Sequence, residues 1–308
     1  MYLQKENYSA DKGIFVDWFN DNYEYCYLDS MHKRIEKFGA QNIVTGLSYG
    51  INAVEPKFFE GLTVNLSMHS QDLYYDYFHV VRAVMNGKNR IKNCILTLGY
   101  YSLFYDLSMS SSKWKCLKTY GPLFGTGHHL EVDDTSNGKV LSEKAFKDFY
   151  YTFFEEEPTY YNSAMVREYT NPELFLRGGW KNLSAGEKKT EAIALCEKHN
   201  KHIFHKETFE ENKMILEGLI SLLVEKNIDV FIVILPFSKE YNTYINPEYK
   251  AILLDYLDKL PYTINFLDFN EYDFLQDEDF LDSDHVNMIG AEKVSTLLSQ
   301  FVEGKMND

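Results

Sequence analysis

Cysteine is scarce in this sequence. The 308 residues include only four, namely Cys26, Cys94, Cys116 and Cys196. They lie far apart and no two form a C-x-x-C pair, so the pattern predicts neither a zinc knuckle nor a framework of disulfide bonds. We expect reduced, mostly buried thiols and no metal site.

Positive charge and long apolar runs are also in short supply. Lys and Arg number 31 against 46 Asp and Glu, which gives a formal net charge of −15 at pH 7. Nucleic acids and anionic membranes bind electropositive surfaces, so neither is expected as a partner. The opening stretch "MYLQKENYSADKG" lacks the apolar core of a signal peptide, and no later run approaches the roughly 20 apolar residues that span a bilayer. We therefore expect a cytoplasmic protein without membrane insertion.

Short apolar runs alternate with helical periodicity along the chain. The runs that predict strands are 42–48, 62–68, 93–99, 229–236 and 263–269. They are apolar throughout, which suits strands covered on both faces. The segments with helical spacing are 71–86, 207–226, 247–260 and 287–303. This alternation predicts an α/β fold, a three-layer α/β/α sandwich around a parallel sheet of about five strands.

Residues 100–206 interrupt the alternation between the third and fourth predicted strands. The segment is rich in tyrosine and phenylalanine, and a structureless loop of that length would be unusual in a packed domain. We predict one domain over residues 1–308, with a large, mostly helical insertion or cap over 100–206.

The first predicted strand ends in "NIVTGLSYG", residues 42–50, where Ser48 stands between Gly46 and Gly50. Glycine and serine are the usual residues of a turn after any strand. The other interpretation is a nucleophile at the carboxyl end of a central strand, where open α/β sheets place their reacting groups. The stretch alone leaves both interpretations open.

A second informative stretch, "FLDSDHVNMIGAEKV", precedes the last predicted helix. An imidazole acts as a general base only when its far nitrogen is anchored, and Asp282 lies three residues before His285, where it can supply that anchor. In isolation the same string is a helix cap formed by Asp284 or Asn287, with His285 beside it. The order Ser, Asp, His along an α/β chain favours the catalytic interpretation.

These residues resemble the SGNH, or GDSL-like, hydrolase superfamily. Its members carry the nucleophile in a Gly-Asp-Ser block after the first strand and end with an Asp-x-x-His block. Here residues 46–48 read Gly-Leu-Ser and residues 282–285 read Asp-Ser-Asp-His. The resemblance implies a flavodoxin-like sheet, with Ser48 as the nucleophile, His285 as the base and Asp282 as its orienting carboxylate.

The family builds its oxyanion hole from the nucleophile N–H, a glycine N–H after the second strand and an asparagine after the third. By that resemblance Ser48 and Ser70 would donate backbone N–H groups. The asparagine is absent, because the Gly-x-Asn block reads Gly99-Tyr100-Tyr101. Losing one donor costs about 2.7 to 4 kcal/mol in the barrier. Either a hydroxyl of Tyr101 or Tyr100 replaces this donor, with Tyr101 the candidate in the oxyanion hole, or the reaction is not ordinary ester hydrolysis. Gly99 and Tyr100 are candidate substrate-binding residues.

The resemblance implies a serine-dependent acyl-ester hydrolase or O-acyltransferase. Divergent members resemble proteins of surface-polysaccharide biosynthesis, which makes a small-molecule or carbohydrate substrate the expectation. No cofactor is expected for hydrolysis, whereas transfer would need an acyl donor such as acetyl-CoA. Two alternatives stay open, a transferase of another group in glycan decoration and a catalytically silent SGNH-fold binding protein.

Two histidine clusters lie outside these blocks. His199, His202 and His205 recur every three residues without an H-E-x-x-H pattern, which predicts a solvated helical face rather than a metal site. His128 and His129 follow "GPLFGTG", a run that lacks the lysine and the spacing of a phosphate-binding loop.

Overall fold

The computed structural model describes residues 22–86, 88, 90–132 and 179–306. The chain divides into two compact units, a smaller one with residues 1–33 and 107–172 and a larger one with residues 34–106 and 173–308. All predicted strands and site residues belong to the larger unit. Residues 133–178 of the expected insertion lie outside the described residues, and the single domain with an insertion over 100–206 stays a prediction.

The larger unit contains a five-stranded parallel sheet. Its strands are β1 (Asn42–Gly46), β2 (Thr63–Asn65), β3 (Asn93–Leu98), β4 (Asp229–Ile234) and β5 (Asn265–Asp268). The strand order is β2-β1-β3-β4-β5, and every neighbouring pair is parallel. This is the flavodoxin-like order of doubly wound sheets. The five predicted strands are confirmed.

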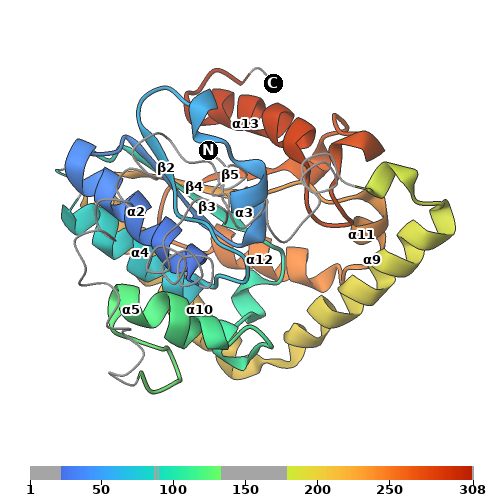
Figure 1. Cartoon of the computed structure of the whole chain (residues 1–308), viewed down its shortest axis with the longest axis horizontal. Coiled ribbons are helices and arrows are strands. Elements are labelled where there is room, and N and C mark those ends of the chain that lie inside the picture. The colour runs from blue at the N-terminus through green and yellow to red at the C-terminus, as the bar shows by residue number, and fades with distance from the viewer. Residues whose placement is uncertain (1–21, 87, 89, 133–178, 307–308) are drawn as a thin grey trace, which may run out of the picture. The chain divides into compact units, whose positions relative to one another are not determined.

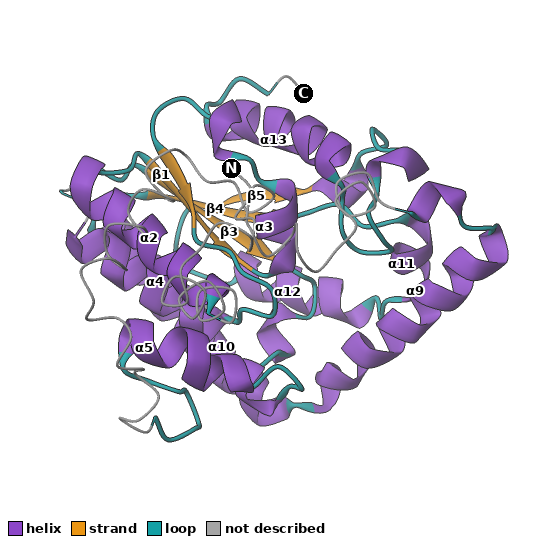
Figure 2. Cartoon of the chain, in the orientation of Figure 1, coloured by secondary structure: helices purple, strands orange, loops and turns teal. Residues whose placement is uncertain are grey.

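Helices cover both faces of this sheet. The helices α4 (Leu73–Asn86), α10 (Lys206–Glu225) and α12 (Glu248–Asp258) share one face, and a hydrogen bond of 2.6 Å from the Tyr256 hydroxyl to the Lys213 carbonyl joins α12 to α10. The opposite face carries α3 (Ser48–Ala53) and α13 (Met288–Val302) (Figures 1 and 2). Right-handed crossovers between parallel strands produce this distribution. The predicted three-layer sandwich is confirmed.

The remaining described elements are mostly helical. They are α2 (Tyr23–Phe38), α5 (Gly121–Phe124), α9 (Ala185–Asn200), α11 (Lys239–Tyr244), the π-helical turn Cys116–Tyr120, and the short turns Pro56–Phe58, Ser102–Phe104, Leu107–Met109, Trp180–Asn182, Lys201–Phe204, Phe269–Glu271 and Asp277–Asp279. The described parts of the expected insertion are mostly helical, as predicted. The four cysteines are free and buried, also as predicted. Within the described ranges, no helix combines the length and the apolar content needed to cross a bilayer.

A buried carboxyl group on α4 contacts β1. Asp76 on α4 is 1% exposed, and one of its oxygens accepts hydrogen bonds from Thr45 (2.6 Å) and Gln71 (2.7 Å). Burial outweighs these bonds and raises the pKa of Asp76 to about 7. Because this pKa lies above the unfolded value, the folded state binds the proton more tightly. Its contribution to stability is complete below about pH 4 and is lost as the pH rises to about 7.

Replacing Asp76 with asparagine is therefore expected to stabilise the protein at alkaline pH. The free energy of unfolding at about pH 8 should rise by up to about 4 kcal/mol, and the difference should shrink toward about pH 4. The amide oxygen still accepts from Thr45 and Gln71 but carries no charge. Urea unfolding at several pH values measures the effect. A difference that does not change with pH would show that the charge of Asp76 is not its cause.

Candidate functional site

Ser48 lies where β1 ends and α3 begins, and it is half-buried. Gly46 adopts φ +145°, and a Cβ there would collide with the carbonyl oxygen of Thr97 on β3. A Cβ at Gly50 would collide with the hydroxyls of Thr97 and Ser67. Both glycines are thus required by the close approach of this turn to the neighbouring strand. That packing fixes the serine at the carboxyl edge of the sheet.

His285 lies in the loop that connects β5 to α13. Its Nε2 is 2.7 Å from the Oγ of Ser48, and its Nδ1 lies 3.0 and 3.1 Å from the two carboxylate oxygens of Asp282. Because an ionised carboxylate can only accept, Nδ1 carries the hydrogen and Nε2 of the neutral ring accepts from the Ser48 hydroxyl. The structure thus brings the three predicted residues together, although Ser48 and His285 are 237 positions apart.

The loop itself holds the carboxylate of Asp282 in place. One of its oxygens accepts from the backbone N–H groups of His285 (2.8 Å) and Asp284 (3.1 Å). Burial disfavours the charged carboxylate, but His285 and these N–H groups outweigh burial and lower the pKa of Asp282 to about 2. Asn287 caps α13 by accepting from two backbone N–H groups of its first turn. The helix cap and the Asp282–His285 contact therefore exist side by side.

Asp284 is a second carboxylate at the same imidazole. One oxygen lies 3.1 Å from Nδ1 of His285, and the other accepts from the Tyr49 hydroxyl at 3.1 Å. Its side chain is buried, and of the two cap candidates, Asp284 and Asn287, it is Asn287 that caps α13. Burial raises the pKa of Asp284, although His285 opposes the shift. Burial alone would lower the pKa of His285, but Asp282 and Asp284 raise it well above its usual range.

The structure gives the Tyr101 hydroxyl a partner other than the expected oxyanion. Tyr101 is 5% exposed, its hydroxyl lies 3.1 Å from that of Tyr49, and its ring stacks on His199 at a centroid distance of 4.3 Å. The phenol therefore belongs to a hydrogen-bond chain that ends on Asp284. Its role as an oxyanion donor stays a prediction.

The other predicted site residues also lie at the carboxyl edge of the sheet. Gly99 packs against Tyr49, since a Cβ there would lie 2.9 Å from the Tyr49 ring. Tyr100 donates to Asp268 at 2.7 Å and lines a cavity of about 440 Å³. Ser70 adopts φ +63°, a left-handed conformation that non-glycine residues rarely take, at the position where the resembled family has glycine. Their functional roles stay predictions.

Sequence reasoning missed two residues of this site. The ring of His69 lies edge-on to that of His285, with the centroids 6.3 Å apart, and the side chain is half-buried. Tyr49 follows the candidate nucleophile and contacts Asp284. Their positions in the sequence are the signal that indicates them, because His69 precedes Ser70 and Tyr49 follows Ser48.

The prediction of a solvated face for the cluster of His199, His202 and His205 is wrong for His199 and His202. Nδ1 of His199 is 2.7 Å from the Tyr241 hydroxyl, and burial lowers the pKa of His199 to about 3. The ring of His202 stacks on Tyr101 at 5.6 Å, and burial lowers its pKa to about 4. Because α9 ends at Asn200, the second histidine falls on a tighter turn that keeps both rings against Tyr101.

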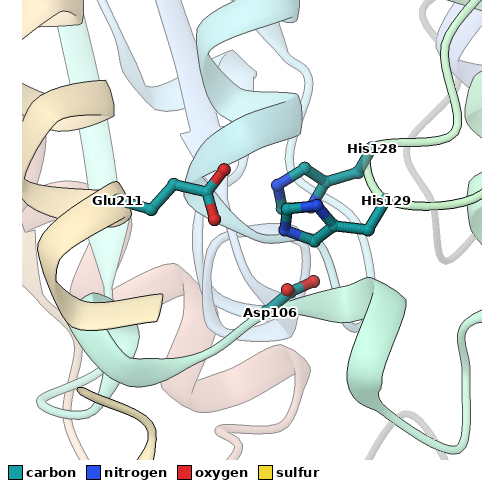
Figure 3. Close-up of side chains that lie close together, drawn as sticks. All are labelled: Asp106, His128, His129 and Glu211. Atoms are coloured by element: carbon teal, nitrogen blue, oxygen red, sulfur yellow. The ribbon is translucent and has the colours of Figure 1, made fainter. Parts of the chain in front are cut away.

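Two further pairs of titratable side chains are labelled in Figure 3, one pair from each unit. In the larger unit, the carboxylates of Asp106 and Glu211 come within 4.8 Å of each other. In the smaller unit, the rings of His128 and His129 stack at 3.9 Å. Each pair within its own unit offers two ligands, fewer than the three or four protein ligands of a zinc site.

No protein-family model and no curated protein sequence matches this chain. Two solved structures are similar over most of their length. One, provisionally described as a platelet activating factor from Streptococcus pneumonia, is 10% identical, has a TM-score of 0.43, and the match covers 96% of this chain and 98% of that one. The other, provisionally described as an acylhydrolase from Bacteroides fragilis, is 9% identical with a TM-score of 0.42, and the match covers 92% and 99%. At this distance neither protein says what this chain does.

Proposed function

We propose that this protein is a serine-dependent acyl-ester hydrolase or O-acyltransferase. The observation that supports it most directly is the line of contacts from Ser48 Oγ to His285 Nε2 (2.7 Å) and from Nδ1 to Asp282 (3.0 Å). In such a line the imidazole removes the serine proton during attack, and the carboxylate stabilises the imidazolium that forms.

The reaction would proceed in two halves. The Oγ of Ser48 attacks the ester carbonyl carbon while its proton passes to Nε2 of His285, and backbone N–H groups of Ser48 and Ser70 are the candidate donors to the oxyanion. Collapse of the tetrahedral intermediate expels the alcohol, which takes the proton from His285 and leaves an acyl-serine. Water then attacks in hydrolysis, or an acceptor hydroxyl in transfer, and His285 again accepts and returns the proton.

The substrate class rests on the resemblance alone. We propose an ester of a carbohydrate or another small molecule, with an acyl donor such as acetyl-CoA if the reaction is transfer. The rival function is a catalytically silent binding protein. Its support is the missing asparagine, together with the bond of the Tyr101 hydroxyl to Tyr49.

A fluorophosphonate probe is expected to modify Ser48, because its hydroxyl is activated by an imidazole at 2.7 Å. Mass spectrometry of the labelled peptide after incubation at alkaline pH, which favours the neutral ring of His285, identifies the modified residue. Ser48→Ala should abolish labelling, whereas Ser111→Ala, at an exposed serine, should not change it. An unlabelled Ser48 in folded protein would favour the silent binding protein.

A further inference from the structure

Two carboxylates, rather than one, face Nδ1 of His285. The nearest oxygen of Asp282 is 3.0 Å from this nitrogen and that of Asp284 is 3.1 Å from it. The two acids differ in exposure, since the side chain of Asp282 is 39% exposed and that of Asp284 only 5%. Water screens the charge of Asp282 more than that of Asp284, yet Asp282 raises the pKa of His285 the most and Asp284 comes second.

A chain of buried hydroxyls fixes the orientation of Asp284. Tyr49 donates to one oxygen of Asp284 at 3.1 Å. A phenol has a single hydrogen, so the 3.1 Å contact between the two tyrosine hydroxyls is a donation from Tyr101 to Tyr49. The Tyr49 side chain is 2% exposed and that of Tyr101 5%. The Tyr49 hydroxyl thus occupies Oδ2 of Asp284, and Oδ1 of Asp284 is left to face Nδ1 of His285.

Other polar and titratable side chains surround His285 and its two aspartates, but none of them takes the place of the negative charge of Asp282 or Asp284. Those that face His285 or its two aspartates from neighbouring elements are Ser48 and Tyr49 on α3, His69 after β2, Tyr101 after β3, Glu191 and His199 on α9, and Tyr241 on α11. The charges that act directly on His285 are Asp282 and Asp284.

We propose that Asp284, held by Tyr49 and Tyr101, is a second positioning carboxylate for His285 and retains the proton on the imidazole at neutral pH. Ser48 then gains a free base only when His285 loses this proton at alkaline pH. The link to activity rests on the proposed hydrolase function. The proton equilibrium of His285 does not, because it exists whether or not the site turns over an ester.

Titration of the His285 imidazole by NMR tests this role. The midpoint in the unmodified protein should lie well above 6.5, with the signal assigned by its loss in His285→Ala. Asp284→Asn should lower the midpoint by about one to three pH units, the usual effect of one nearby opposite charge. Asp268→Asn is the matched control, because Asp268 is also a buried carboxylate that accepts from a tyrosine hydroxyl, that of Tyr100. This control should leave the midpoint unchanged.

Tyr49→Phe provides a second, milder variant. This variant removes the hydroxyl that donates to Asp284. Without that donor the neutral form of the Asp284 carboxyl is favoured, so the midpoint of His285 should again fall, but by less than in Asp284→Asn. Circular dichroism shows whether each variant is folded. Midpoints within about half a unit of the unmodified value in both folded variants would overturn the proposal.

Fluorophosphonate labelling of the same variants separates the two ideas. If Ser48 is labelled and the midpoint does not move in Asp284→Asn, the second carboxylate is wrong and the hydrolase stands. If the midpoint moves but Ser48 is never labelled, the role of Asp284 stands and the hydrolase is wrong. If the hydrolase function and the role of Asp284 are both correct, the acid limb of the pH profile for labelling should move to lower pH in Asp284→Asn, together with the NMR midpoint of His285.

Discussion

His285→Ala is expected to lower the rate of ester turnover by a factor on the order of 10³ to 10⁶. The imidazole is the base that contacts the Ser48 hydroxyl, at 2.7 Å, so without it the serine keeps its proton. The value of kcat/KM for an activated aryl ester measures the loss. Added imidazole should restore part of the rate, because the substitution empties the space that the ring occupied beside Ser48.

The control for this substitution is His129→Ala, which removes an exposed imidazole from the smaller unit. Its rate should stay within about twofold of the unmodified protein, as is usual for the substitution of an exposed residue. A folded His285→Ala protein that keeps more than about a tenth of the rate would contradict the proposed base.

Removing both aspartates beside His285 is expected to cost about 10⁴-fold in kcat, because the imidazole then loses the partner that fixes its reactive tautomer. Asp282→Asn alone should cost only about 10- to 100-fold, since a carboxylate oxygen of Asp284 still lies 3.1 Å from Nδ1 and can take over the support of the imidazole. Asparagine is the appropriate substitute at position 282 because its amide oxygen can still accept from the backbone N–H groups of the loop. The loop should therefore keep its shape.

A double-mutant cycle measures how far Asp284 takes over the role of Asp282. The four proteins are compared at a pH above every acid limb, so that differences in protonation do not enter the rates. The losses of the two single variants should multiply to much less than the loss of the double variant. A loss in Asp282→Asn equal to that of the double variant would show that Asp284 does not support the imidazole.

Much of the fold follows from local patterns. The apolar run "DVFIVILP" predicts a strand covered on both faces, and it forms β4 between β3 and β5. The apolar spacing over 287–303 predicts a helix, and α13 occupies nearly the same residues. Strands and helices can be predicted from such patterns because the spacing of apolar residues shows which side of a segment is buried. This spacing involves only a few neighbouring residues.

Part of the site is readable for a similar reason. Ser48 and His285 each stand in a short block with its own signature, and both blocks lie at the ends of predicted elements. Because parallel strands end at one edge of the sheet, residues that follow different strands meet there. The sequence therefore predicts the pairing of this serine and histidine, and the structure places them in contact.

The sequence by itself determined the alternation of strands and helices, the strand that ends at Ser48 and the loop that carries Asp282 and His285. Only the tertiary structure decided that Asp284 faces the imidazole rather than capping α13, and that Tyr101 bonds to Tyr49. Tyr101 and Tyr49 are 52 positions apart, and Tyr49, which donates to Asp284, lies 235 positions before it. Periodicity shows that such groups are buried, but which of them meet, and therefore where a proton resides, depends on the packing of distant segments to within the length of a hydrogen bond.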